Sequence, residues 1–111
     1  MNTIFKYAGY KVSVKFGQYE NGAIALQLYT EIGELYDTVT VNLMNDGWLP
    51  APNEIIVKIN EYVDGDILKT LRDNNVITDE DGIEIKYGFE KKCTAFMVEL
   101  TDSAYAEFAK I

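Results

Sequence analysis

The N-terminal part of the chain alternates between apolar and polar residues with the period of two that is typical of β-strands. From Tyr10 to Phe16, apolar side chains at every second position alternate with two lysines and a serine. This pattern predicts a half-buried strand. Asn21 and Gly22 follow it and predict a hairpin turn, because both residue types tolerate positive φ. The segment from Ala23 to Tyr29 is therefore expected to run back antiparallel to the first strand.

A second turn is expected around Ile32-Gly33-Glu34. It leads into a segment from Tyr36 to Leu43, in which Val39, Val41 and Leu43 alternate with polar residues. Because this segment is rich in β-branched residues, it is predicted to form a third strand. The first forty-odd residues are thus expected to form a meander of at least three strands.

The segment from Asn45 to Asn53 breaks the alternation. Pro50 and Pro52 cannot donate to a strand ladder and bias their predecessors away from helix, so a loop is predicted here. Its Trp48 either anchors the loop on the core or stands out as a partner-binding residue, since a large aromatic side chain in a loop serves both purposes. A short strand from Glu54 to Ile59 is predicted after the loop.

A helix is predicted from Asp66, as its N-cap, through Asn74. Its apolar stripe consists of Ile67, Leu68 and Leu71, and Asn75 suits the left-handed position after the last turn. Further along the chain, strands are predicted over residues 83–87 and about 94–100, followed by a short helix capped by Thr101 or Asp102. The chain from 1 to 111 is therefore predicted to be a single α+β domain. We expect a mostly antiparallel sheet, with an N-terminal β-meander and a C-terminal β-hairpin, and one or two short helices packed on it.

Composition agrees with a folded globular protein, because 48% of the residues are apolar and 25% are charged. Cys93 is the single cysteine, so no intramolecular disulfide can form. No basic leader and no run of about 18 apolar residues is present, so neither export nor membrane insertion is predicted. We expect the protein in the cytoplasm.

The chain contains no histidine, which removes the commonest general base and the commonest nitrogen ligand of zinc. Cys93 therefore lacks a base, and it is interpreted as a buried or incidental thiol. The acidic turn over residues 79–82 resembles a calcium loop only superficially. With Gly82 at the sixth position, the first and twelfth positions are Ile77 and Gly88, which cannot bind the ion through a carboxylate. We predict no catalytic residue, no metal and no cofactor, and hence no enzyme.

Acidic residues gather in one part of the sequence. Between Asn60 and Glu84 there are eight carboxylates and only two cations, which gives this stretch a formal charge of −6 out of −8 for the whole chain. A protein partner can bind to such a local concentration of negative charge, although the charge can also simply keep the protein soluble. The candidate partner-binding residues are these carboxylates together with Trp48: Glu61, Asp64, Asp66, Asp73, Asp79, Glu80, Asp81 and Glu84.

Nucleic acid is not expected to bind directly. Three lysines and three tyrosines of the first hairpin region combine cations with aromatic rings, as single-strand binding proteins do. The net charge of −8 nevertheless repels a polyanion.

Three segments of the chain suggest a family. Tyr19 to Leu28 contains a Tyr-x-Asn-Gly turn, Thr38 to Leu43 a Thr-Val-Asn-Leu strand, and Ile56 to Tyr62 a Val-Lys-x-x-x-Tyr segment. In this order they resemble a family of short uncharacterised bacterial proteins, a domain of unknown function common on plasmids, conjugative elements and phages of gut bacteria. The resemblance covers about residues 10 to 100, and departs from the family in the loop from Met44 to Asn53 and after Leu100.

The resemblance implies a mobile-element setting, in which small acidic proteins often act as counter-defence factors. It therefore implies an inhibitor of the anti-CRISPR or anti-restriction kind, whose partner is a CRISPR or restriction effector with a basic groove. No residue role is carried over, because none is established for the family. The alternative is a structural or assembly accessory protein that self-associates through a sheet edge or the Trp48 loop.

Overall fold

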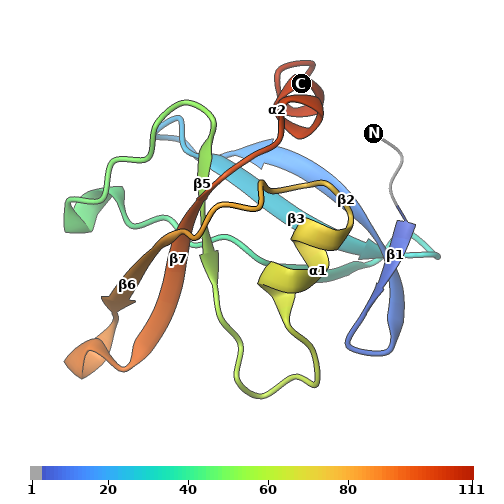
Figure 1. The fold of residues 1–111 in the computed structure, drawn as a ribbon, viewed down its shortest axis with the longest axis horizontal. Coiled ribbons are helices and arrows are strands. Elements are labelled where there is room, and N and C mark those ends of the chain that lie inside the picture. Colours follow the sequence, from blue (N-terminus) through green and yellow to red (C-terminus); the bar gives the residue numbers. More distant parts are fainter. Residues whose placement is uncertain (1–3) are drawn as a thin grey trace.

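The structure, a computed structural model, describes residues 4–111 and is an α+β domain of two antiparallel sheets and two short helices (Figure 1). The first sheet contains, in spatial order, β1 (Ile4–Tyr7), β2 (Tyr10–Gln18), β3 (Ile24–Thr30) and β4 (Leu35–Thr38). The second sheet has the order β5 (Glu54–Lys58), β7 (Cys93–Glu99) and β6 (Ile83–Tyr87). The helices are α1 (Ile67–Asp73) and α2 (Asp102–Phe108), and two 3₁₀ turns are η1 (Met44–Asp46) and η2 (Phe89–Lys91). The predicted fold class, including the meander and the C-terminal hairpin, is confirmed.

The predicted hairpin between β2 and β3 is also present. The backbone N–H of Tyr19 donates to the carbonyl of Ala23 at 2.8 Å, and the N–H of Gly22 donates to that of Tyr19 at 2.9 Å. Gly22 has a φ of 92°, whereas Asn21 keeps a negative φ. Only one of the two turn residues therefore uses the left-handed region, and it is the one without a Cβ.

The strand predicted over Tyr36 to Leu43 ends in the first sheet at Thr38. Beyond this residue the chain exchanges partners: the N–H of Val39 still donates to β3, but the N–H of Val41 donates to Ile56 of β5. Thr40 forms a bridge with Val57 of β5. The chain thereby passes from the first sheet to the second, and for this reason the seven strands divide between two sheets.

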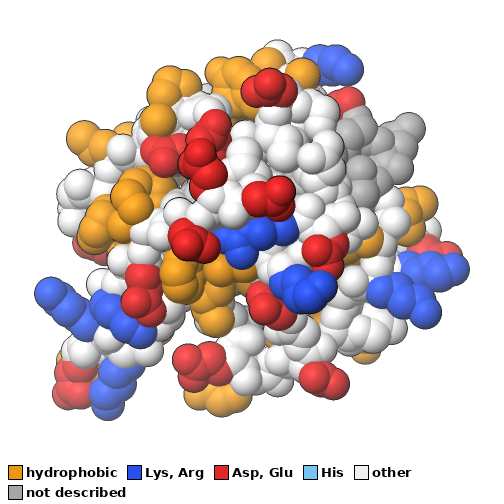
Figure 2. Space-filling model, viewed as in Figure 1, with side chains coloured by type: hydrophobic (Ala, Val, Ile, Leu, Met, Phe, Trp, Pro, Cys, Tyr) orange, Lys and Arg blue, Asp and Glu red, His pale blue; other side chains and the backbone are white. Residues whose placement is uncertain are grey.

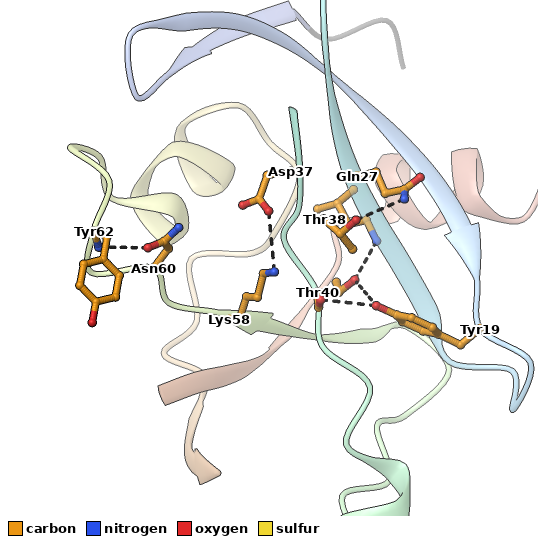
Figure 3. A network of polar contacts seen from close by, with 9 residues as sticks. Tyr19, Gln27, Asp37, Thr38, Thr40, Lys58, Asn60 and Tyr62 are labelled. Atoms are coloured by element: carbon orange, nitrogen blue, oxygen red, sulfur yellow. Dashed lines mark hydrogen bonds and ion pairs between the residues drawn. The ribbon is translucent and has the colours of Figure 1, made fainter. Parts of the chain in front are cut away.

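Thr40 is the buried polar residue at this crossing (Figure 3). Its Oγ1 accepts the N–H of Leu26 at 3.1 Å and lies 3.1 Å from the hydroxyl of Tyr19. Close by, the ammonium of Lys58 on β5 lies 3.7 Å from the carboxylate of Asp37 on β4. These contacts join the two sheets while leaving the buried hydroxyl with hydrogen-bond partners.

The main core lies between the two sheets and is closed by the helices. It contains buried side chains of β1, β2, β3, β5 and β7, together with Ile67 and Leu71 of α1 and Ala104 of α2. A second, smaller cluster covers the opposite face of the second sheet and is formed by Leu43, Ile56, Ile85 and Ala95. Ile55 belongs to the main core and Ile56 to the smaller cluster, as the alternation of side chains along a strand requires.

Both helices begin at the predicted caps. Asp66 accepts the N–H of Lys69 at 3.1 Å, and Thr101 accepts the N–H of Ala104 at 3.2 Å. Asn75 follows α1 with a φ of 58°, which is the left-handed conformation expected after the last turn. Among residues 4–111, no helix is long and apolar enough to cross a membrane.

Tyr7 gives the fold a predictable response to alkaline pH. Burial of its ring raises the pKa of the Tyr7 hydroxyl, and the carboxylates of Asp37 and Asp66 raise it further. A folded-state pKa above the unfolded value means that this contribution to stability is complete below about pH 10 and is lost as pH rises through the folded pKa. We expect Tyr7→Phe to make the alkaline decline of the unfolding free energy shallower, as measured by urea denaturation between pH 8 and pH 11. An unchanged slope would show that the Tyr7 hydroxyl does not titrate in this way.

Candidate functional site

The candidate partner-binding carboxylates lie mainly on one face of the molecule. α1, the loop before it and the segment after it lie on the near side in Figure 1, and these elements carry the acidic stretch between Glu61 and Glu84. Figure 2, drawn from the same side, shows carboxylates over much of this face, with lysine and arginine side chains among them. We call the surface formed by residues 61–84 the acidic face.

Two carboxylates of the acidic face stabilise α1. Asp66 caps its N-terminus, and Asp73 lies 2.6 Å from the ammonium of Lys69, one turn earlier. The hydrogen bond to Asp73 raises the pKa of Lys69. Because the pair is exposed, its effect on stability is small. These two carboxylates are partly engaged within the chain.

Arg72 ties the segment after α1 to the helix. Its guanidinium donates to the backbone carbonyls of Thr78 at 3.2 Å and Glu80 at 3.1 Å. The N–H of Thr78 also donates to the carbonyl of Glu99 on β7 at 2.9 Å. The acidic residues 79–81 are thus held against both α1 and the second sheet, so their carboxylates are displayed from a fixed backbone.

Five carboxylates of the acidic face form neither an ion pair nor a side-chain hydrogen bond in the described part of the chain, and all are exposed: Glu61, Asp64, Asp79, Glu80 and Asp81. Glu84 differs, because it lies 3.5 Å from the ammonium of Lys86 on the same strand. The negative charge that remains open to a partner therefore comes from two places, the loop before α1 and the turn after it.

Trp48 does not lie with these carboxylates. Its ring packs on the smaller cluster with Leu43, Ile56 and Met97. This cluster covers the face of the second sheet opposite to the main core and α1. The structure therefore separates Trp48 from the acidic face and places it as a half-buried anchor of its own loop.

A hollow beside the acidic face had no clear signal in the sequence. It has a volume of about 520 Å³ and lies between the loop before α1, the first turn of α1 and β7. Its apolar lining includes Ile59, Val63, Leu68 and Phe96, which are half-buried against the main core. In the sequence, Leu68 forms an apolar stripe of ordinary width with Ile67 and Leu71, which does not distinguish it from a fully buried core residue.

The rim of this hollow is shaped by a local turn. The side-chain carbonyl of Asn60 accepts the N–H of Tyr62 at 3.0 Å (Figure 3). Such an Asx turn reverses the backbone directly after β5. It leaves the Tyr62 side chain 99% exposed and places Glu61 at the edge of the hollow.

Cys93 is exposed, so the interpretation of a buried thiol is wrong, and that of an incidental thiol stays a prediction. Within residues 4–111, no three potential ligands among Cys, Asp and Glu are arranged to hold a metal ion.

Comparison with known proteins gave no further guide: no family model, no curated protein and no solved structure matches the chain. The resemblance to a mobile-element family stays a sequence-based prediction.

The capping role of Asp66 predicts a stability effect. Replacing Asp66 by alanine removes the acceptor of the Lys69 N–H and should lower the unfolding free energy by about 1 kcal/mol. Asp64→Ala is the matched control, because Asp64 is exposed in the same loop and its side chain forms no hydrogen bond with any of residues 4–111. It should change stability by less than about 0.5 kcal/mol. Chemical denaturation measures both, and equal effects of the two substitutions would argue against the cap.

Proposed function

We propose that this protein is a non-enzymatic binding protein that inhibits a nucleic-acid-handling effector, such as a CRISPR or restriction nuclease, in the cytoplasm. In this proposal the acidic face docks on a basic groove of the effector. The observation that supports it is the set of five exposed carboxylates around α1 that have no cationic partner among residues 4–111, three of which (residues 79–81) extend from a backbone held by Arg72. The counter-defence setting comes from the sequence resemblance alone.

The size of the charge indicates local docking rather than imitation of a whole duplex. The molecule is 36 Å along its longest axis. A DNA duplex of this length carries about 20 phosphate charges, at one charge per about 1.7 Å. The acidic stretch has a net charge of −6. It can therefore speed association with a basic groove and occupy part of it, which is what an inhibitor needs.

Cleavage assays test this proposal. Purified CRISPR and restriction nucleases are assayed on DNA with and without the protein, and inhibition of at least one of them is expected. The variant Asp79→Asn, Glu80→Gln, Asp81→Asn should inhibit that nuclease at least about tenfold less strongly, because it removes charge from the acidic face.

The matched control is Glu20→Gln, Glu31→Gln, Glu34→Gln, which removes three charges from exposed hairpin turns of the first sheet. It should inhibit like the unmodified protein. Absence of inhibition across the panel contradicts the proposed function, and equal loss in both variants contradicts the role of the acidic face.

Self-association is the second candidate function, and one observation favours it. β6 pairs only with β7 in the described part of the chain, so its other edge is open, and Ile83 on it is 52% exposed. Against it, Glu84 and Lys86 place charges along this short strand, which discourages edge-to-edge pairing. Light scattering at increasing concentration separates the candidates, since a dimer that persists at high salt would favour self-association through β6.

A further inference from the structure

We propose that the hollow beside α1 receives a single large apolar side chain of the partner, flanked by lysine or arginine. This inference rests on the proposed function, because it names the chemistry of the partner segment that the acidic face would bind. We call the hollow, lined by residues 59–61, 63, 65–68 and 96, the α1 hollow.

The apolar part of the site comes from side chains that extend the main core to the surface. Ile59, Val63, Leu68 and Phe96 pack against buried core residues and are themselves only half-buried. Burying apolar area contributes about 25 cal/mol per Å², so covering these side chains is favourable. The volume of about 520 Å³ lies within the range of about 300–1,000 Å³ that is usual for small-ligand pockets. It suits one large side chain together with part of its neighbours.

The polar part of the site selects cations. Glu61 lines the α1 hollow and forms no ion pair or side-chain hydrogen bond among residues 4–111, and Asp66 lines it from the helix cap. Figure 2 shows hydrophobic side chains exposed between carboxylates on this face. An apolar side chain followed by a guanidinium or ammonium therefore satisfies both parts, because burial provides the anchor and the rim carboxylates pair with the cation.

A neighbouring hollow differs from the α1 hollow in the charges that line it. It has a volume of about 320 Å³, and its lining includes Lys58, Lys92 and Tyr62 together with Glu61, which lines both hollows. Its lysines already pair with carboxylates, Lys58 with Asp37 and Lys92 with Glu90, whereas the α1 hollow is lined by two carboxylates and no lysine or arginine. The cations of the partner are accordingly expected over the α1 hollow and not over its neighbour.

Three short capped peptides test the inference by NMR: Arg-Trp-Arg, Arg-Ser-Arg and Glu-Trp-Glu. Titrating Arg-Trp-Arg into isotope-labelled protein should shift the methyl signals of Ile59, Val63 and Leu68 at millimolar concentration. Its affinity should exceed that of each of the other peptides by about tenfold, because only it supplies both anchor and cation. Equal binding of all three, or shifts centred elsewhere, would overturn the proposal.

A pair of charge reversals in one loop sharpens the test. Glu61→Lys should weaken Arg-Trp-Arg binding by about tenfold, since Glu61 lines the hollow, whereas Asp64→Lys should weaken it by less than about threefold. Equal weakening would mean that the general field, and not the hollow, attracts the peptide. Both side chains are exposed and form no hydrogen bond or ion pair in the part of the chain that the structure describes, so both variants should stay folded.

These titrations need no effector, so their outcome does not depend on whether the proposed function is correct. Peptide binding without nuclease inhibition would uphold the hollow and reject the inhibitor role. Nuclease inhibition by the protein, with no peptide binding at the α1 hollow, would support the inhibitor role and reject the hollow as a binding site.

Discussion

Leu71→Ala is expected to destabilise the protein by about 3 kcal/mol, within the range of about 2–5 kcal/mol for truncating a buried leucine. Leu71 is fully buried in the main core, where it attaches α1 to the strands. α1 has seven residues, and a helix this short is not stable without packing. Urea denaturation should therefore show a clearly lower midpoint for this variant.

Leu49→Ala is the matched control for this substitution. Leu49 is 70% exposed in the loop before β5, so its truncation should change stability by less than about 0.5 kcal/mol. If both variants lost the same stability, the packing of α1 would not be the cause. Because α1 positions the acidic face, Leu71→Ala should also weaken any binding that depends on that face.

Gly82→Ala is expected to cost about 2–3 kcal/mol for a steric reason. A Cβ at this position would lie 2.6 Å from the carbonyl oxygen of Met97 and 2.6 Å from Cγ1 of Val98. The backbone of Gly82 is not in the left-handed region, so the cost arises from contact with β7 and not from backbone strain. Accommodating the methyl group requires the acidic turn to move away from the second sheet.

Gly17→Ala provides the comparison for this substitution. Its Cβ would meet only the Cβ of Ala25, at 3.9 Å, and its φ is ordinary. Here alanine should be neutral or stabilise by up to about 1 kcal/mol, because it restricts the unfolded chain. Thermal unfolding of the two variants measures the contrast, and a Gly82→Ala protein as stable as Gly17→Ala would show that the turn does not pack on β7 as described.

The features that were predicted from the sequence are local. The β2–β3 hairpin depends on Gly22, and α1 depends on Asp66 at one end and Asn75 at the other. Each of these residues acts on backbone groups within a few positions of itself. Short-range patterns were therefore sufficient for these two elements and the fold class, whereas β1 was not predicted and the strand expected over Tyr36 to Leu43 was too long.

The features that the sequence did not indicate depend on distant contacts. The division into two sheets follows from the pairing of Thr40 with Val57, and the α1 hollow is lined by Leu68 of α1 and Phe96 of β7, which are far apart in the sequence. The separation of Trp48 from the acidic face likewise depends on which side of the second sheet it packs. No periodicity in the sequence encodes these arrangements.

The central claim is that the acidic face is where cationic partners associate. Titrating a short oligo-arginine peptide into labelled protein, with NMR shifts followed at every assigned residue, tests it directly. We predict that the largest shifts map to residues 61–84 and weaken as salt is raised, since exposed charges are screened. Shifts of similar size at the exposed carboxylates of Glu20, Glu31 and Glu34 would contradict the claim and leave the acidic stretch as a solubilising surface.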